Sequence, residues 1–280
     1  MAETLEMRQA RLKALFEKID NFVAHPWILY HEPFRVVGDV YYLGNSYVST
    51  FLIDTGEGLI LIDPGFQQMV YQVFDAVRKL GFETKDIKHI FLSHGHMDHV
   101  GATRVLQEYT GARVWIGRDD VFFFTERRDL IVNEHWVPEF TVTDTYDYEK
   151  PFEMGRVKIN FVHSPGHTPG TTSFFIETTH RGEKVVCAMH GGLGLNGLTR
   201  EELEENRLPI RLQSDFVNGL RTLGQRHVDV VLPSHMHNYD MLARKALDDG
   251  SGDAFVDPAA WKNMLDSQLE KAKEVLPELF

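Results

Sequence analysis

Four potential metal ligands lie in one short segment of the chain. The segment directly follows Ile87–Leu92, an apolar run typical of a strand, and contains His94, His96, Asp98 and His99. A turn at the end of a strand can aim several side chains at one point, whereas side chains within a strand alternate between its two faces. Imidazoles packed this closely would repel one another when protonated, unless a cation is shared between them. The spacing therefore predicts a metal site, and Zn²⁺ accepts both nitrogen and carboxylate oxygen.

Two more histidines occur at the ends of apolar runs. His167 lies in Ser164–Gly170, a turn that contains two prolines and two glycines. A backbone fixed in this way can deliver a single ligand from outside the main cluster. His235 follows the strand-like run Val228–Leu232. Because residues at strand ends converge on one edge of an α/β sheet, we expect both histidines to join the first four residues.

Composition limits the class of protein and its partners. The chain has 280 residues, of which 43% are hydrophobic and 25% are charged, as is ordinary for a globular protein. Its formal net charge is −12. Proteins that bind nucleic acid usually present a cationic track to the phosphates, so this charge argues against a nucleic-acid partner. We expect a small-molecule substrate instead.

The N-terminal segment and the single cysteine bear on the compartment. Charges interrupt Met1–Lys18, which therefore lacks the continuous apolar region of a secretory signal. No run approaches the roughly 20 apolar residues of a membrane span. Cys187 is the only cysteine, so an intrachain disulfide is excluded and a reducing compartment fits. These features predict a cytoplasmic protein with no membrane partner.

The chain divides into an N-terminal arm and a main domain. Near-helical spacing of apolar residues predicts an amphipathic helix over residues 3–20, with an apolar face of Leu5, Leu12, Leu15 and Phe16. We expect residues 1–34 to form an arm that packs on a domain of residues 35–280. A lid over the site and a contact in a homo-oligomer are the alternatives for this arm. The aromatic segment 122–140 is expected either to pack in the core or to form a pocket wall.

The remaining segments alternate between the two secondary-structure periods. Strands are predicted at 36–42, 47–53, 58–62, 87–92, 113–116, 157–163, 172–177, 184–189 and 228–232, and helices at 66–80, 100–109, 210–223 and 258–275. No Pro-, Gly- or Ser-rich linker separates these blocks. The pattern predicts an α/β (α+β) domain in which helices cover two packed sheets.

The segment 94–99 matches the HxHxDH motif of the metallo-β-lactamase fold superfamily. The resemblance extends through 61–65, 165–173 and His235, and it covers most of the chain from about residue 35 to 270. Within that superfamily the chain is most similar to the third subclass of metallo-β-lactamases, through the phrase around His167 and through 254–258. The resemblance implies an αββα sandwich that binds two zinc ions.

The same resemblance implies a role for each candidate ligand. One zinc ion would be bound by His94, His96 and His167, and the other by Asp98, His99 and His235. Asp63 is similar to a carboxylate of the family that orients a ligand histidine without touching metal. The implied mechanism is attack on a carbonyl by hydroxide held between the metal ions, after which Asp98 passes a proton to the leaving group.

Two departures from the family pattern concern the substrate. His190 stands where most hydrolases of the superfamily have a bridging aspartate and third-subclass lactamases usually have serine. A second serine, which helps to hold the carboxylate of a β-lactam, is replaced by Gly192. We therefore expect no clamp for a lactam carboxylate. His190 is left with three roles to be distinguished: metal ligand, hydrogen-bond partner of a ligand, or substrate contact.

The sequence thus predicts a zinc hydrolase of cyclic amides or esters. A thioesterase or lactonase of the glyoxalase-II-like type is the alternative within the fold, although such proteins normally retain the aspartate that His190 replaces. A non-catalytic metal-binding or sensor protein is the alternative from another class. Structural or incidental roles are expected for His135, His163 and His237.

Overall fold

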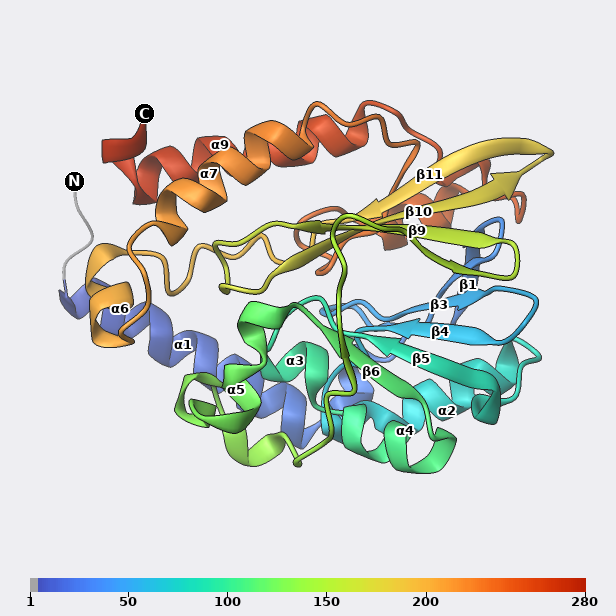
Figure 1. Ribbon diagram of the computed structural model, residues 1–280, viewed down its shortest axis with the longest axis horizontal. Coiled ribbons are helices and arrows are strands. Elements are labelled where there is room, and N and C mark those ends of the chain that lie inside the picture. The colour runs from blue at the N-terminus through green and yellow to red at the C-terminus, as the bar shows by residue number, and fades with distance from the viewer. Residues whose placement is uncertain (1–4) are drawn as a thin grey trace.

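Two β-sheets stacked face to face form the centre of the molecule, and helices cover both outer faces (Figure 1). The computed structural model describes residues 5–280. The layers follow the order helix, sheet, sheet, helix, so the predicted αββα sandwich is confirmed. Among the described residues, no helix is both long and apolar enough to cross a bilayer.

The first sheet brings three parallel strand ends to one edge. Its strands, in spatial order, are β1 (Phe34–Val37), β2 (Val40–Tyr42), β3 (Phe51–Asp54), β4 (Leu59–Ile62), β5 (Ile87–Phe91), β6 (Arg113–Ile116) and β7 (Asp144–Thr145). Strands β1 to β4 pair antiparallel, whereas β4 to β7 pair parallel. The carboxyl ends of β4, β5 and β6 therefore lie side by side.

The second sheet also brings the carboxyl ends of three strands to one edge. Its strands, in spatial order, are β12 (Val230–Val231), β11 (Glu183–Met189), β10 (Thr172–His180), β9 (Val157–His163) and β8 (Phe152–Met154). Strand β10 is antiparallel to both β9 and β11, and β11 is parallel to β12. Consequently β9, β11 and β12 run in one direction and end at the same edge.

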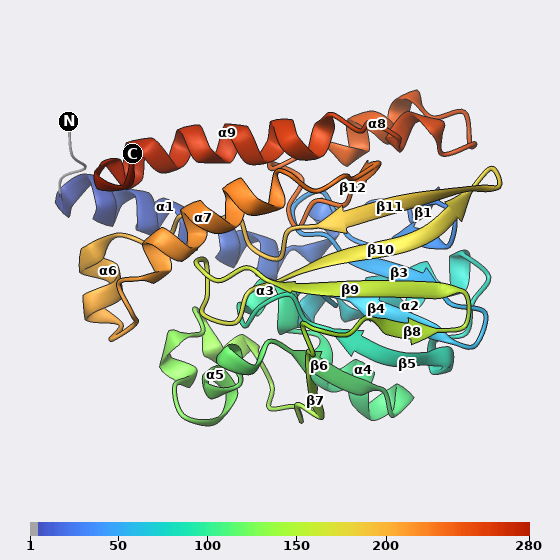
Figure 2. The ribbon, with the colours of Figure 1, turned by 45° about the horizontal axis from the view of Figure 1, so that its top comes forward.

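Helices pack on both sheets and at one end of the molecule. Beneath the first sheet lie α2 (Val70–Lys79), α3 (Met97–Val100) and α4 (Thr103–Thr110), and above the second lie α7 (Leu212–Leu223) and α9 (Ala260–Val275) (Figures 1 and 2). The others are α1 (Leu5–Ala24), α5 (Phe122–Thr125), α6 (Arg200–Glu205) and α8 (Met241–Leu247). Short 3₁₀ helices occupy Pro26–Leu29, Gln67–Met69, Thr84–Asp86, Arg118–Asp120, Arg128–Leu130, Glu134–Trp136, Asp253–Phe255 and Pro277–Leu279.

Aromatic side chains fill the space between the sheets. Phe91 from β5 lies 5.3 Å from the ring of Phe161 and 6.3 Å from that of Phe174, between ring centroids. Phe91 and Phe174 are fully buried. Replacing such a residue with alanine typically costs about 3 to 5 kcal/mol, so this layer holds the two sheets, and the loops at their edges, in fixed relation.

Several predicted boundaries differ from the structure. The strand predicted at 36–42 is a hairpin of β1 and β2, because Gly38 adopts a left-handed turn with φ of 51°. The strand predicted at 47–53 begins only at Phe51, because the side chain of Asn45 accepts hydrogen bonds from two following amides and holds a loop. Strand β12 spans fewer residues than the predicted 228–232. Strands β7 and β8 and helices α3, α5, α6 and α8 were not predicted.

The N-terminal helix is confirmed as a backbone element, α1. Residues 3 and 4 of the predicted span lie outside the described residues, and so do the side chains of Leu5, Leu12, Leu15 and Phe16. Near the end of α1, Phe22 is buried, and its ring lies 5.0 Å from that of Tyr47. The last turns of the arm therefore pack on the main domain of the same chain. A role of α1 in a homo-oligomer stays a prediction.

Candidate metal centre

The candidate ligands occupy loops that begin where adjacent strands end. In the first sheet, Asp63 follows β4 and the segment 94–99 follows β5. In the second sheet, His167 follows β9 and His235 follows β12. Because these strands end at the same edge of their sheets and the sheets are stacked, residues far apart in sequence meet there.

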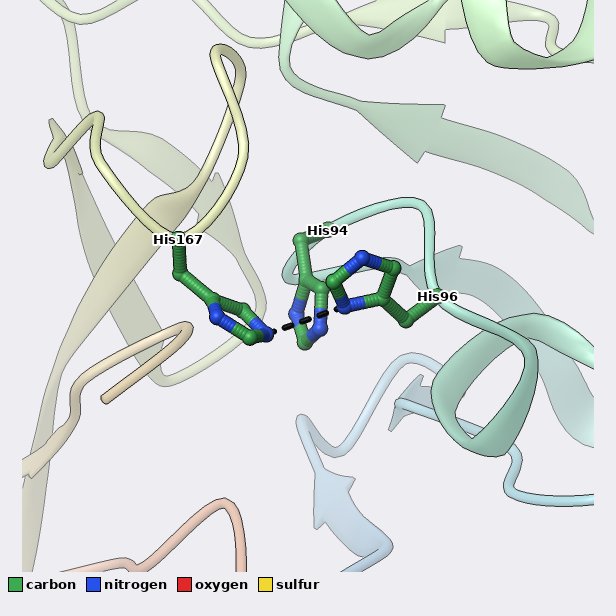
Figure 3. A group of neighbouring side chains, drawn as sticks. All are labelled: His94, His96 and His167. Atoms are coloured by element: carbon green, nitrogen blue, oxygen red, sulfur yellow. Dashed lines mark hydrogen bonds between the residues drawn. The ribbon is translucent and has the colours of Figure 1, made fainter. Parts of the chain in front are cut away.

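Three histidines form the first group of potential ligands, which we call the three-histidine group (Figure 3). His94, His96 and His167 each offer one ring nitrogen, and these atoms lie within 4.8 Å of one another. Nδ1 of His96 is 2.9 Å from Nε2 of His167. Residues from both sheets thus aim their ring nitrogens at one point.

Hydrogen bonds leave lone pairs facing the centre of this group. Nδ1 of His167 donates to the carbonyl oxygen of Gly194 at 2.9 Å, which leaves Nε2 unprotonated in the neutral ring. The hydroxyl of Ser93 donates to Asp63 at 2.6 Å and accepts from Nδ1 of His94 at 2.9 Å. Nε2 of His94 is therefore also a lone pair, and it is buried without a hydrogen-bond partner. An uncompensated buried acceptor of this kind fits a bound cation.

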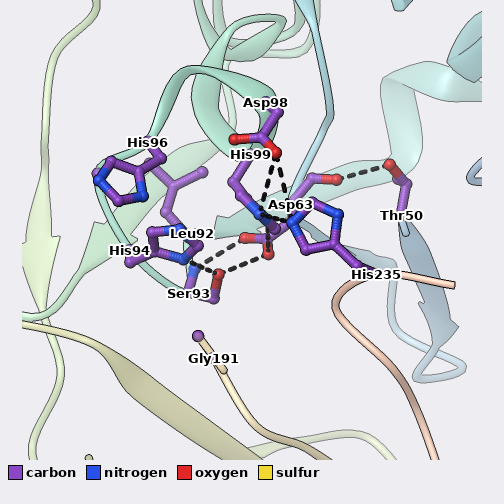
Figure 4. Close-up of polar contacts among 12 residues, drawn as sticks. Thr50, Asp63, Leu92, Ser93, His94, His96, Asp98, His99, Gly191 and His235 are labelled. Atoms are coloured by element: carbon purple, nitrogen blue, oxygen red, sulfur yellow. Dashed lines mark hydrogen bonds and ion pairs between the residues drawn. The ribbon is translucent and has the colours of Figure 1, made fainter. Parts of the chain in front are cut away.

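Asp98, His99 and His235 form the second group, which we call the aspartate group (Figure 4). Nδ1 of His99 donates to Asp63 at 2.8 Å, and Nδ1 of His235 donates to the carbonyl oxygen of Tyr47 at 3.2 Å. Their Nε2 atoms lie 3.2 Å apart, and lie 3.7 Å and 3.4 Å from Oδ2 of Asp98. Three acceptors converge with no proton between them in the neutral tautomers, so this group also fits a cation.

The electrostatics keep most of these side chains in the form that binds metal. Burial lowers the pKa of His94 and His167 well below the usual value, and lowers those of His96 and His235 to about 4 and about 3. These imidazoles are therefore neutral at neutral pH.

Asp98 and His99 face each other, and each shifts the pKa of the other. Burial opposes ionisation of Asp98, but the facing His99 and His235 outweigh it and lower the pKa of the carboxyl. Burial likewise favours neutral His99, yet Asp98 and Asp63 outweigh it and raise the pKa of that ring. The aspartate group is thus the place where negative charge would attract a cation most strongly.

Asp63 supports both groups from the end of β4. Its carboxylate accepts hydrogen bonds from the Ser93 amide at 2.7 Å, from the Ser93 hydroxyl at 2.6 Å and from His99 at 2.8 Å. Asp63 is completely buried and belongs to neither group of potential ligands. Its position agrees with the expected role, in which it orients ligands without touching metal.

Asp120 is a supporting residue that the sequence analysis missed. It follows β6 and is completely buried. Its carboxylate accepts from the Gly95 amide at 3.1 Å, from the Gly170 amide at 2.6 Å and from the Thr168 hydroxyl at 2.6 Å. It therefore joins the loop of His94 and His96 to the loop of His167. A carboxylate a few residues after a third neighbouring strand is the signal that could have revealed it.

His190 directly follows β11 and belongs to neither group of potential ligands. It is 2% exposed, and burial lowers its pKa to about 3. Its Nδ1 accepts a hydrogen bond from the Gly192 amide at 3.2 Å. His190 is also absent from the lining of the cavity that contains His94, His96 and His167. These positions favour a supporting role for His190 over contact with metal or substrate.

Two glycines pack against the ring of His167. A Cβ atom on Gly192 would lie 2.6 Å from Cδ2 of His167, and one on Gly194 would lie 2.6 Å from Cε1. A Cβ atom at either position would clash with the ring of His167 unless the ring or the glycine backbone moved. The glycine that replaces the expected serine at 192 is therefore needed for the present position of His167.

Both groups contribute to the lining of a cavity of about 370 Å³. His94, His96, Asp98, His167 and His235 all contribute to its lining. His237, for which the sequence predicted an incidental role, also lines the cavity, and its ring lies 5.1 Å from that of His235. From the aromatic segment 122–140, Phe123 lines the cavity while Phe124 and Phe140 pack against the core. The segment therefore supplies both a pocket wall, through Phe123, and core packing, through Phe124 and Phe140.

His135 and His163 lie elsewhere. Nε2 of His163 donates to the carbonyl oxygen of Pro169 at 2.9 Å, which supports the turn that carries His167. The ring of His135 is tilted against that of Trp136, with centroids 4.8 Å apart. Neither belongs to a ligand group or to the cavity lining.

Comparisons with known proteins agree with this arrangement. The Metallo-beta-lactamase superfamily matches residues 43–180, which contain five of the six candidate ligands. The structure of BJP-1, a subclass B3 metallo-beta-lactamase of Bradyrhizobium japonicum, superposes with a TM-score of 0.80 at 25% identity, over 90% of this chain and 96% of that one. The chain belongs to the metallo-beta-lactamase superfamily, a group of metal-dependent hydrolases, and is similar to its B3 lactamases.

Two relatives show how widely the superfamily has diverged. YobT of Bacillus subtilis, an uncharacterized protein, is 29% identical over 54% of this chain and 66% of its own length. The hydroxyacylglutathione hydrolase GloC of Haemophilus influenzae is 24% identical over 54% of this chain and 71% of its own length. The particular reaction must therefore be inferred from the site itself.

Proposed function

We propose that the protein is a dinuclear zinc-dependent hydrolase that cleaves a cyclic amide or an ester. The observation that supports this most strongly is the convergence of ring lone pairs and one carboxylate in the lining of a cavity. Five imidazoles and one carboxylate form a donor set that suits zinc. The three-histidine group and the aspartate group would each hold one ion.

The reaction proposed is the addition of water to a carbonyl carbon, followed by loss of the amine or alcohol. When bound, two zinc ions lower the pKa of water and polarise a carbonyl oxygen. The chain itself orients the ligands: Asp63 and Asp120 fix the loops, and backbone carbonyls fix His167 and His235. A site held in place before substrate binds needs little reorganisation during the reaction.

Asp98 is the residue proposed to move a proton. Its two histidine contacts both use Oδ2, so Oδ1 is the oxygen that can take a proton and return it to the leaving group. The lowered pKa of Asp98 keeps this carboxylate ionised and ready to accept.

A thioester is the second candidate substrate, because of the similarity to the hydrolase GloC. Water would add to the thioester carbonyl carbon and a thiol would leave. The same metal centre can serve both reactions, so ligand geometry does not separate them.

The test combines metal analysis with a substrate panel. We expect close to two equivalents of zinc after mild purification, and turnover of a lactone, of nitrocefin or of a thioester. His235→Ala should lose about one equivalent, whereas His227→Ala, which removes an exposed histidine outside both groups, should keep two. A reproducible single equivalent with full activity would rule out the dinuclear site. Two equivalents with no turnover on any carbonyl substrate would favour a metal-binding or sensor protein.

A further inference from the structure

The loop between β2 and β3, residues 43–50, holds one of the candidate ligands, and we call it the cradle loop. The carbonyl oxygen of Tyr47 accepts hydrogen bonds from Nδ1 of His235 at 3.2 Å and from the Met236 amide at 3.1 Å. Val48 and His235 also form an antiparallel bridge. The direction in which the His235 ring points therefore depends on the position of the cradle loop.

The N-terminal arm packs on the side chain of the same tyrosine. The ring of Phe22, near the end of α1, lies 5.0 Å from that of Tyr47, and the ring of His235 also lies 5.0 Å from it, between centroids. Phe22 is buried, and the ammonium group of Lys18 lies 5.3 Å from the centroid of the Tyr47 ring. The Tyr47 ring thus contacts both the arm and a candidate ligand.

Two further hydrogen bonds connect the cradle loop to the arm and to the metal centre. The Ser46 amide donates to the carbonyl oxygen of Leu29, in the 3₁₀ helix that follows α1, at 2.9 Å. The Thr50 hydroxyl donates to the carbonyl oxygen of Asp63 at 2.6 Å (Figure 4). Asp63 in turn orients His99, so the loop is connected to two histidines of the aspartate group. Closely packed groups transmit a displacement to their neighbours.

We propose that Phe22 is a positioning residue for His235, acting through the ring and the carbonyl group of Tyr47. Docking of the arm against Tyr47 then favours metal binding by the aspartate group. The inference rests on the proposed function for the presence of a metal ion in that group. The coupling is reciprocal, because an ion that fixes His235 also fixes the tyrosine on which the arm packs. The arm and the second metal ion therefore stabilise each other.

The first experiment measures the zinc affinity of each group by competition with a chelator. Phe22→Ala should weaken binding at the aspartate group at least about tenfold and leave the three-histidine group unchanged. Phe22→Leu, which keeps an apolar side chain against Tyr47, should recover most of the affinity. The matched control is Phe74→Ala, which breaks another Phe–Tyr pair with the same 5.0 Å spacing, between α2 and α4. Equal zinc affinities in the unmodified protein and Phe22→Ala, or an equal loss in Phe74→Ala, would overturn the proposal.

Variants of Tyr47 test the route of the coupling. Tyr47→Phe keeps the ring and the carbonyl group, so it should retain the zinc affinity of the aspartate group. Tyr47→Ala removes the ring and should lose about as much affinity as Phe22→Ala. The double variant should bind the second ion no more weakly than Tyr47→Ala alone, because both substitutions break the same contact. Additive losses would show that Phe22 acts independently of Tyr47 and would overturn the proposal.

The reciprocal effect is measured in the arm itself. Filling the aspartate group with zinc should slow amide hydrogen exchange at residues 20–24 of α1, by a factor comparable to the affinity that Phe22→Ala loses. Asp98→Asn, which removes a ligand of that group, should lack this slowing. If exchange in the arm does not respond to the second equivalent of zinc, the arm and His235 are not coupled.

Hydrogen exchange in the metal-free protein needs neither zinc nor substrate. The Met236 amide donates to Tyr47, so Phe22→Ala should raise its exchange rate at least about tenfold above that in Phe74→Ala. An unchanged rate at Met236 would overturn the proposal whatever the zinc content. A single zinc equivalent in the unmodified protein, together with faster exchange at Met236 in Phe22→Ala, would instead contradict the proposed function and keep Phe22 as the residue that positions His235.

Discussion

The three-histidine group and the aspartate group differ in charge and in how the chain supports them. The first has neutral rings, and Asp120 ties together the two loops that carry it. The second includes an ionised carboxylate and is oriented by Asp63 and by the carbonyl oxygen of Tyr47. Asp63 also reaches the first group, through the hydroxyl of Ser93. The three-histidine group would therefore bind a cation through the placement of its ring nitrogens alone, whereas the aspartate group adds a Coulombic attraction for the cation.

The largest expected effect is that of Asp98→Asn. The amide keeps the size of the side chain but removes the negative charge and the proton acceptor. Turnover should fall at least about 100-fold, and the aspartate group should lose its metal while the three-histidine group retains one equivalent. Metal content and kcat/KM, measured beside His227→Ala, check this. Unchanged turnover would remove Asp98 from the chemistry and erase the difference between the groups.

Asp63→Asn should affect both groups. Its carboxylate accepts from His99 directly and from His94 through Ser93, so the substitution should weaken metal binding by about 10- to 100-fold at both sites. Ser93→Ala should weaken binding only at the three-histidine group, because it leaves the contact between Asp63 and His99. Competition with a chelator, read as two separate affinities, distinguishes the variants. If both variants weaken the same single site, Asp63 does not link the groups.

Asp120→Asn should loosen the three-histidine group and change how stability depends on pH. An amide cannot accept all three hydrogen bonds, so we expect a loss of about 1 to 3 kcal/mol in the free energy of unfolding.

Burial raises the pKa of Asp120 to about 7, above the value of about 3.9 expected in the unfolded chain. The protonated carboxyl group of Asp120 therefore stabilises the folded protein. This contribution to the free energy of unfolding is fully present below about pH 4 and is lost as the pH rises through about 7. The stability advantage of the unmodified protein over the variant should narrow between pH 5 and pH 8. Urea unfolding of both metal-free proteins at several pH values measures this difference in stability. If the difference widens as the pH rises, the three hydrogen-bond donors keep the Asp120 carboxylate ionised.

The smallest effect on metal is expected for His190→Ser. Because His190 lies outside both groups and outside the cavity lining, the variant should keep two equivalents of metal and an unchanged preference between lactam and ester. Loss of one equivalent would make His190 a ligand, and an altered substrate preference would place it against the substrate.

The convergence of the six candidate ligands could be predicted from sequence because each follows an apolar run, where chain direction determines which edge of the sheet it reaches. The strands 113–116 and 157–163 were also located correctly, since apolar residues mark them clearly. Asp120 also follows a strand, so its place at this edge could have been expected, but its hydrogen-bond partners could not. The contact of Asp120 with Gly170, the contact of α1 with Tyr47 and the place of His237 in the cavity lining involve segments distant in sequence, and no local pattern records them.

The origin of the aliphatic residues that line the cavity has a consequence for how such a protein can diverge. Ile19 precedes the family match at 43–180, and Leu193, Leu203 and Leu208 follow it, whereas Leu130, Val132 and five of the six candidate ligands lie within it. The cavity lining is thus encoded in part outside the stretch that carries most of the candidate ligands. Mutations around α6 can change which molecules enter without moving a ligand, so a lineage can explore new substrates while its reaction chemistry is inherited intact.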